Sequence, residues 1–129
     1  MSLITPRLSG SLLPGVVRAS VLTLAQDLGI PVEERLVTVQ EWRDGATDGS
    51  ICETFACGTA AAITPLGGVR SEASEWAIGD GSEGPITSRL RSALFDIHHG
   101  RVPDPHGWMH PICKPDQADL AHEPNRTNN

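Results

Sequence analysis

Two short loops contain residues that could hold an anion through the backbone. The first is Leu12–Arg18 (LLPGVVR), in which a Pro-Gly turn precedes a run with helical spacing. The first amide N–H groups of a helix have no acceptor within the helix, and the helix dipole favours negative charge there. Phosphate could therefore bind at this loop without charged side chains, although the loop taken alone is more simply an ordinary junction between a loop and a helix.

The second loop is Cys57–Ala62 (CGTAAA). Gly58 would let the backbone approach a ligand closely, because it has no side chain. Thr59 could donate both its hydroxyl and its N–H, and the alanines beside it leave space. Taken alone, these residues also suit a tight turn between two strands.

The elements that would position these loops are indicated by apolar spacing and by Gly and Pro. The strongest pattern predicts a helix at Leu12–Leu28, which Gly29 would end with a positive φ. A second helix is predicted at Ile86–His98, between Gly84-Pro85 and Gly100. The other predictions are strands at Val32–Val39, Ile51–Cys57 and Ala60–Pro65, a short helix or loop at Gln40–Ser50, a turn at Gly67-Gly68, and a hairpin at Val69–Ile78 with its tip at Ser71–Ser74.

Length, charge and cysteine count exclude several classes of protein. With 129 residues, the chain is one domain at most, or part of one. A net charge of −6 with scattered arginines argues against nucleic-acid binding. No stretch approaches the roughly 20 apolar residues of a membrane span. Three cysteines without disulfide or zinc spacing indicate a reducing cytoplasm.

Two other chemistries are weaker interpretations of the same sequence. His106 and His110 have the i, i+4 spacing that could grip zinc on a helix, but the prolines and the glycine around them forbid a long helix there. A nucleophilic Cys57 with a histidine partner would lack an orienting third group. We therefore expect neither a metal site nor a cysteine nucleophile.

Taken together, the motifs resemble those of a known family. The runs LSGSLLPGVVRAS, ETFACGTAAAITPLGGV, IGDGSEGPITSRLRSALFDIHHG and DPHGWM are similar, in order and spacing, to the C-terminal part of the branched-chain aminotransferases, between Leu3 and Met109. These are fold-type IV enzymes that depend on pyridoxal 5′-phosphate. DPHGWM and GTAA…TP favour this group over D-amino-acid aminotransferases and aminodeoxychorismate lyases.

The resemblance implies a fold and a division of the chain. We expect the α/β C-terminal pseudo-barrel domain of fold-type IV aminotransferases, a mixed sheet with outer helices and with Ile51–Ile78 at its centre. Residues 1–111 would form this segment of the large domain. Residues 112–129 are polar and rich in proline, so we expect this tail to be disordered or to lie as an arm on a neighbour.

The resemblance also implies roles for five residues. Leu13 would pack against the pyridine ring of the cofactor. Val16 and Val17 would donate their N–H groups to the cofactor phosphate, and Thr59 would bind the same phosphate. The N–H groups of Thr59 and Ala60 would receive the carboxylate of the substrate.

Two positions depart from the family pattern. The family usually has Thr at Val17 and Asp at Ala19. The first change removes one hydroxyl donor to the phosphate, which is worth about 1 kcal/mol and would weaken the site without abolishing it.

In this family the lysine that forms a Schiff base with the cofactor lies upstream of the Leu-Pro-Gly loop, as does the acid that faces the pyridine nitrogen. The only lysine here is Lys114, in the tail, and we do not expect it to take that role. The sequence thus predicts a fragment of a transaminase for branched-chain amino acids and 2-oxo acids, with no catalytic residue and inactive alone.

The alternative is a non-catalytic domain that binds anions or proteins. As family members are oligomers, we expect a homo-oligomer, and Trp108 would lie either at such a contact or in the core.

Overall fold

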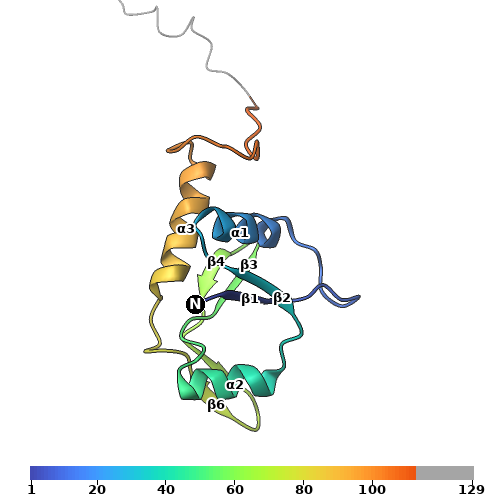
Figure 1. The fold of residues 1–129 in the computed structure, drawn as a ribbon, viewed down its shortest axis with the longest axis vertical. Coiled ribbons are helices and arrows are strands. Elements are labelled where there is room, and N and C mark those ends of the chain that lie inside the picture. The colour runs from blue at the N-terminus through green and yellow to red at the C-terminus, as the bar shows by residue number, and fades with distance from the viewer. Residues whose placement is uncertain (113–129) are drawn as a thin grey trace, which may run out of the picture.

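The computed structural model describes residues 1–112, so the tail from 113 onward, with Lys114 and Cys113, lies outside the described residues. Helices and strands alternate through the first half, and a long helix follows near the end (Figure 1). The elements are β1 (Leu3–Pro6), α1 (Val16–Asp27), β2 (Val32–Arg35), α2 (Val39–Asp48), β3 (Phe55–Gly58), β4 (Ala62–Pro65), β5 (Gly68–Arg70), β6 (Glu75–Ala77) and α3 (Pro85–His98).

The chain opens with a β-α-β unit. Strand β1 pairs in parallel with β2, from Leu3 opposite Val32 to Pro6 opposite Arg35, and α1 connects them. Because parallel strands point the same way, their carboxyl ends share one edge. Helices α1 and α2 therefore both begin at this edge, as Figure 1 shows. The sequence did not predict β1.

Helix α1 ends as predicted but begins later than Leu12. Gly29 follows it with φ 72°, and the N–H of Ile30 closes the end by donating to the Ala25 carbonyl at 2.8 Å. The helix begins at Val16, after the cap residue Gly15. The residues before Gly15 form an exposed loop instead of a first turn.

The core lies where α1 and α3 meet the β3–β4 hairpin. Helix α3 matches its prediction to within one residue at its start, and Leu90, Leu94 and Ile97 are its buried face. The opposing α1 contributes a stripe with helical spacing. The buried apolar cluster consists of Val21, Leu24, Ala25, Ile30, Ile63, Leu90, Leu94 and Ile97.

The six strands form three separate two-stranded sheets instead of the one mixed sheet that we expected. Hairpins β3–β4 and β5–β6 are antiparallel, and the second turns between Ser71 and Ser74 as predicted. The α/β class is confirmed, whereas assignment to the pseudo-barrel domain stays a prediction. Other bounds differ as well. The predicted strand at Val32–Val39 stops at Arg35, because Thr38 caps α2, and Gly68 begins β5. The strands predicted at Ile51–Cys57 and Ala60–Pro65 begin only at Phe55 and Ala62, because Ala60 belongs to the turn of the hairpin.

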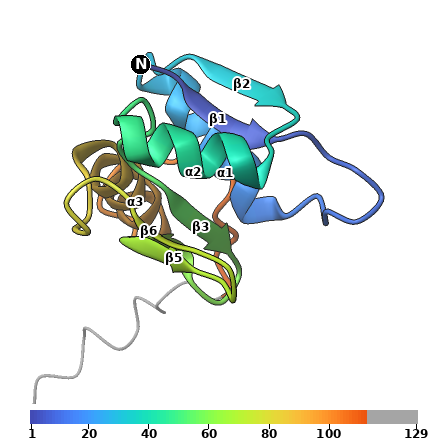
Figure 2. The same cartoon turned by 90° about the horizontal axis from the view of Figure 1, so that it is seen from below.

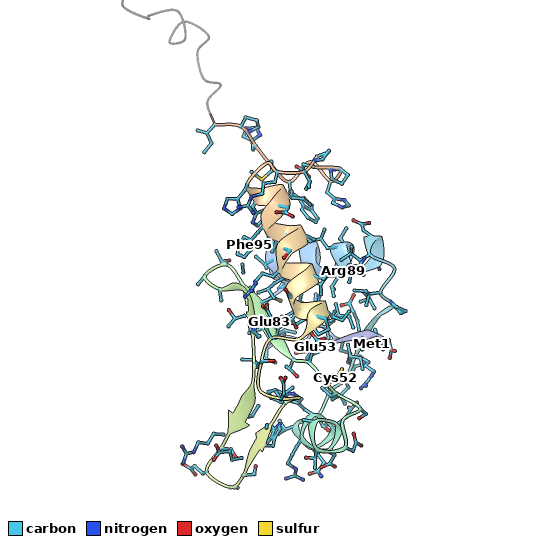
Figure 3. All side chains as sticks on the ribbon, turned by 90° about the vertical axis from the view of Figure 1, so that its left-hand side faces the viewer. Met1, Cys52, Glu53, Glu83, Arg89 and Phe95 are labelled. Carbon is cyan, nitrogen blue, oxygen red and sulfur yellow. The ribbon has the colours of Figure 1, made fainter. Side chains whose placement is uncertain are left out.

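Glu53 lies two residues before β3, and its side chain reaches the start of helix α3 (Figure 3). Its carboxylate accepts the N–H of Ile86 at 3.1 Å and both the N–H and the hydroxyl of Thr87 at 2.8 Å. Cap residue Gly84 has no side chain to offer, so Glu53 takes the role of a helix cap from 33 residues away in sequence. An added Cβ at Gly84 would overlap the Glu53 carboxyl group.

The DPHGWM segment folds back onto helix α1. The Asp104 carboxylate accepts hydrogen bonds from the N–H of Met109 at 2.7 Å and from the N–H of His106 at 3.2 Å. These two hydrogen bonds, that from Met109 above all, lower the pKa of Asp104. His106 contacts Asp27 at 2.7 Å and stacks on Trp108 with the ring centroids 4.4 Å apart. Trp108 packs against the core cluster of this chain and is thereby partly buried.

Replacing Glu53 by Gln should lower the free energy of unfolding by about 1–3 kcal/mol. The charged carboxylate that accepts three hydrogen bonds from Ile86 and Thr87 is then replaced by an amide with a single acceptor oxygen, whose NH2 group faces another donor. Urea unfolding followed by tryptophan fluorescence measures the change. Glu72→Gln is the control, since Glu72 is exposed and contacts no donor among residues 1–112. Equal stability of the two variants would show that the Glu53 cap contributes nothing.

The Asp104 turn should loosen in acid. A carboxyl whose folded pKa is lowered stabilises the fold above its unfolded pKa of about 3.9, and this stabilisation is lost as the pH falls through the folded value. Amide NMR signals of Met109 and Trp108 should therefore shift below about pH 4 in the wild type. In Asp104→Asn they should already be shifted at pH 7 and should no longer depend on pH in that range.

Candidate functional site

The start of α1 presents a row of unpaired amides. The first hydrogen bond of the helix runs from the N–H of Ala19 to the carbonyl of Gly15 at 3.1 Å. The N–H groups of Val16, Val17 and Arg18 have no acceptor in the part of the chain that the structure describes. No acidic residue lies in this first turn, and no side chain caps it. The site can therefore accept an anion from outside.

Arg18 fixes this first turn of α1 against both parallel strands. Its guanidinium donates to the Pro6 carbonyl of β1 at 3.0 Å and to the Glu34 carboxylate of β2 at 2.6 Å. The side chain is 14% exposed, and its Nε is buried without a partner among residues 1–112. The role of Arg18 is not evident from the sequence, because nothing local marks its distant contacts.

Leu13 and Val16 lie on the outside of the loop. Their exposed fractions are 83% and 82%, which is unusual for apolar side chains so close to a core. Val17 is instead partly buried and packs against the core cluster. Of the three loop residues singled out from the sequence, Leu13 and Val16 thus have exposed side chains, and Val16 also has an unpaired N–H.

The predicted second loop is the tip of the β3–β4 hairpin. Gly58 pairs with Ala62, so Thr59, Ala60 and Ala61 form the connection. Thr59 and Ala60 are exposed, and neither their N–H groups nor the Thr59 hydroxyl has a partner among the residues described. A Cβ added at Gly58 would meet nothing within 4 Å, so open space lies beside the backbone there.

Ala62 closes this hairpin with φ 48°, the left-handed conformation that side chains with a Cβ disfavour. It is the one non-glycine residue with positive φ among residues 1–112. Such a conformation costs about 1 kcal/mol and persists only where the surroundings hold it. Here the next residue, Ile63, is buried in the core and supplies that restraint.

The two loops belong to elements that pack against each other. Helix α1 contacts β3, and Figure 2 shows the first turn of α1 beside the end of β3. Burial raises the pKa of the Cys57 thiol, and the nearby positive charge of Arg18 partly opposes this shift.

Histidines do not gather into a metal site within residues 1–112. No group of three or more His, Cys, Asp or Glu side chains that could hold an ion occurs there. The His106 ring is hydrogen-bonded to the Asp27 carboxylate. The segment from His106 to His110 is irregular, whereas an i, i+4 pair of metal ligands would need a helix there.

The fold defines an α/β domain with unpaired backbone N–H groups at the start of α1 and at the turn of the β3–β4 hairpin. The family model for class IV amino-transferases matches residues 2–68, and the chain belongs to this family.

More particularly, its relatives are branched-chain aminotransferases. A Streptomyces coelicolor protein with the name probable branched-chain-amino-acid aminotransferase is 50% identical over 111 residues, which are 86% of this chain and 31% of the relative. The Mycobacterium tuberculosis branched-chain-amino-acid aminotransferase is 54% identical over 107 residues, which are 83% and 29%.

Solved structures agree with these relatives. The Escherichia coli branched-chain amino acid aminotransferase matches with a TM-score of 0.68 and 34% identity, over 83% of this chain and 33% of that one. A T.th. enzyme of the same name, solved with pyridoxamine 5′-phosphate, matches with a TM-score of 0.63 and 29% identity, over 81% and 31%. The chain thus spans about a third of the length of the proteins it matches, and the resemblance to branched-chain aminotransferases is confirmed.

None of the helices within residues 1–112 is both long enough and apolar enough to cross a membrane.

The two described cysteines should differ in reactivity. Cys52 is exposed, whereas burial raises the pKa of Cys57, so less of its thiolate is present at a given pH. With iodoacetamide at pH 8, Cys52 should be modified first, and the rate at Cys57 should keep rising at higher pH. Peptide mass spectrometry measures both rates. Faster modification of Cys57 than of Cys52 would contradict the burial seen at the end of β3.

Proposed function

We propose that this chain is the part of a branched-chain aminotransferase that holds the phosphate of pyridoxal 5′-phosphate and the carboxylate of the substrate. The observation that carries the proposal is the row of unpaired amides at Val16, Val17 and Arg18, at the start of a helix that packs beside the Thr59 hairpin. The match to class IV aminotransferases, and to a relative solved with pyridoxamine 5′-phosphate, supports it.

The residues present fit a phosphate group. The unpaired polar groups at the start of α1 are N–H donors. The acid that contacts Arg18 is Glu34, and its carboxylate is already bonded to that arginine. A helix start without acidic residues leaves the positive end of the dipole uncompensated. A phosphate would satisfy the unpaired amides at the start of α1.

Each residue would then have a separate task. Val16 and Val17 would donate backbone N–H groups to the phosphate, and Thr59 would add its hydroxyl from the hairpin. The exposed Leu13 side chain would lie against the ring and exclude water from that face. When bound, pyridoxal phosphate supplies an electron sink for the charge that develops on the substrate.

The hairpin tip would orient the substrate. The N–H groups of Thr59 and Ala60 would donate to the carboxylate of a branched-chain amino acid or its 2-oxo acid. The proton transfer between substrate and cofactor requires a lysine base. None of residues 1–112 is a lysine, so we propose that this base comes from a segment that this chain does not match in its relatives and that the chain alone is inactive.

We further propose that the protein works as a homo-oligomer in the cytoplasm. The two described cysteines are free thiols, which suits a reducing compartment.

Phosphate binding should depend on the N–H of Val16. Pro is compatible with this first helical position, because Gly15 before it is already extended, with ψ 141°, and Val16 itself is exposed. Val16→Pro should therefore keep the fold but weaken binding of pyridoxamine 5′-phosphate by about tenfold or more, since one charge-assisted hydrogen bond is lost. Titration by amide NMR measures the affinity and locates the shifted signals.

The matched control is Val16→Ala, which removes the side chain but keeps the N–H, and it should bind like the wild type. Pyridoxamine without phosphate should bind far more weakly. Equal weakening by Val16→Pro and Val16→Ala, or shifts confined to residues remote from α1 and Thr59, would refute the proposal. Equal affinity for inorganic phosphate and for pyridoxamine 5′-phosphate would favour the non-catalytic anion-binding alternative.

A further inference from the structure

The β3–β4 hairpin turns through a backbone conformation that alanine disfavours. Ala62, which closes the turn, has φ 48° and lies opposite Gly58 in the register of the two strands. Glycine and asparagine adopt this left-handed conformation more readily than alanine does. Backbone outliers of this kind gather at ligand-binding sites, where the surrounding structure holds them. The groups around Ala62 therefore indicate what its conformation does.

Three contacts hold the side of the turn that leads into β4. The Ala62 side chain packs against the core cluster, and Ile63 after it is 2% exposed. The hydroxyl of Thr64 donates to the carbonyl of Ala61 at 3.2 Å and so restrains the peptide between Ala61 and Ala62. This half of the turn is thus held by the core on one side and by its own strand on the other.

The half of the turn that follows β3 is open. Thr59 and Ala60 are exposed, and their N–H groups have no partner among residues 1–112. A Cβ added at Gly58 would meet nothing within 4 Å, so no neighbouring group supports the backbone there. The direction of these two N–H groups is therefore set by the held half of the turn, through Ala61 and Ala62.

We propose that Ala62 is a positioning residue for the carboxylate of the substrate. The inference rests on the proposed function, in which Thr59 and Ala60 receive that carboxylate. At positive φ, the Cβ of alanine excludes most of the conformations that are open to glycine. The core contact then selects one of them, and the turn presents its two N–H groups in a fixed direction. Donors that are fixed beforehand bind an anion more tightly, because less entropy is lost on binding.

Ala62→Gly should relieve the strain and loosen the turn together. Glycine adopts a φ near 48° freely, so the urea midpoint of unfolding should not fall below that of the wild type. The greater freedom of the turn should lower the heteronuclear NOE of the Thr59 and Ala60 amides in NMR. A merely structural Ala62 would show the reverse: stability would fall with the lost core contact, and these amides would stay unchanged.

The binding test uses two stable analogues that differ in one group. N-(5′-phosphopyridoxyl)-L-leucine carries the phosphate, the branched side chain and the carboxylate, and the matching leucinamide has a neutral amide in place of the carboxylate. In calorimetry, the wild type should prefer the acid about tenfold or more, because the amide cannot accept charge-assisted hydrogen bonds. Ala62→Gly should reduce this preference about threefold or more and leave the affinity for the leucinamide unchanged.

Ala56→Gly is the matched control, because Ala56 is exposed on β3 and pairs with Thr64 in the same hairpin, outside the turn. Glycine within a strand should lower the urea midpoint, while the preference for the acid and the NOE values stay at the wild-type level. Three results would overturn the proposal: an unchanged preference in Ala62→Gly, an equal fall in its affinity for both analogues, or the same loss of preference in Ala56→Gly.

This inference and the proposed function fail separately. Both analogues carry the phosphate, so Val16→Pro should weaken them by the same factor and leave the preference unchanged. Such binding, with a preference that Ala62→Gly does not alter, would refute this inference alone. Binding of neither analogue by the wild type would refute the proposed function. In that case, NOE values lowered by Ala62→Gly would still support a turn fixed by Ala62, and unchanged values would refute it.

Discussion

The parallel pairing of β1 with β2 is the constraint on which the proposed site depends. With Leu3 opposite Val32 and Pro6 opposite Arg35, the chain must return along α1 before it can form β2. That return places the first turn of α1 at the carboxyl edge of the strands, where its amides are free. Arg18 then bonds this turn to both strands at once. A slipped register would move the donors and their anchor together.

The hairpin that carries Thr59 is held by a different set of contacts. Glu53 lies just before β3 and accepts hydrogen bonds from the start of α3. Helix α3 also packs against β4, the other strand of the hairpin. Because α3 also packs against α1, both donor loops are positioned by one apolar core. Stability and site geometry are therefore coupled: a loss of packing at this core would move the two loops relative to each other.

Local patterns in the sequence predicted what is locally determined. Helix α3 and the end of α1 follow from apolar spacing and from Gly29, and these were confirmed. Strand β1 was not predicted, because four residues are too few to show an alternating apolar pattern and because its partner strand β2 is distant in sequence. The contacts of Arg18 and Glu53 could not be predicted for the same reason, since their partners lie 12 to 34 residues away. The two loops were found by residue type, but no sequence pattern could show that their elements pack together.

An acidic chain can still offer a phosphate site, because the electrostatic field at the exposed start of α1 is set by near neighbours. At an ionic strength of 0.15 M, charges more than about 8 Å apart across solvent are largely screened. Glu34 is neutralised by Arg18, so the net charge of −6 matters less at α1 than its unpaired amides. Backbone donors also persist when side chains change. At the proposed site, Val17 would lack the hydroxyl donor of a Thr, but the row of N–H groups stays intact.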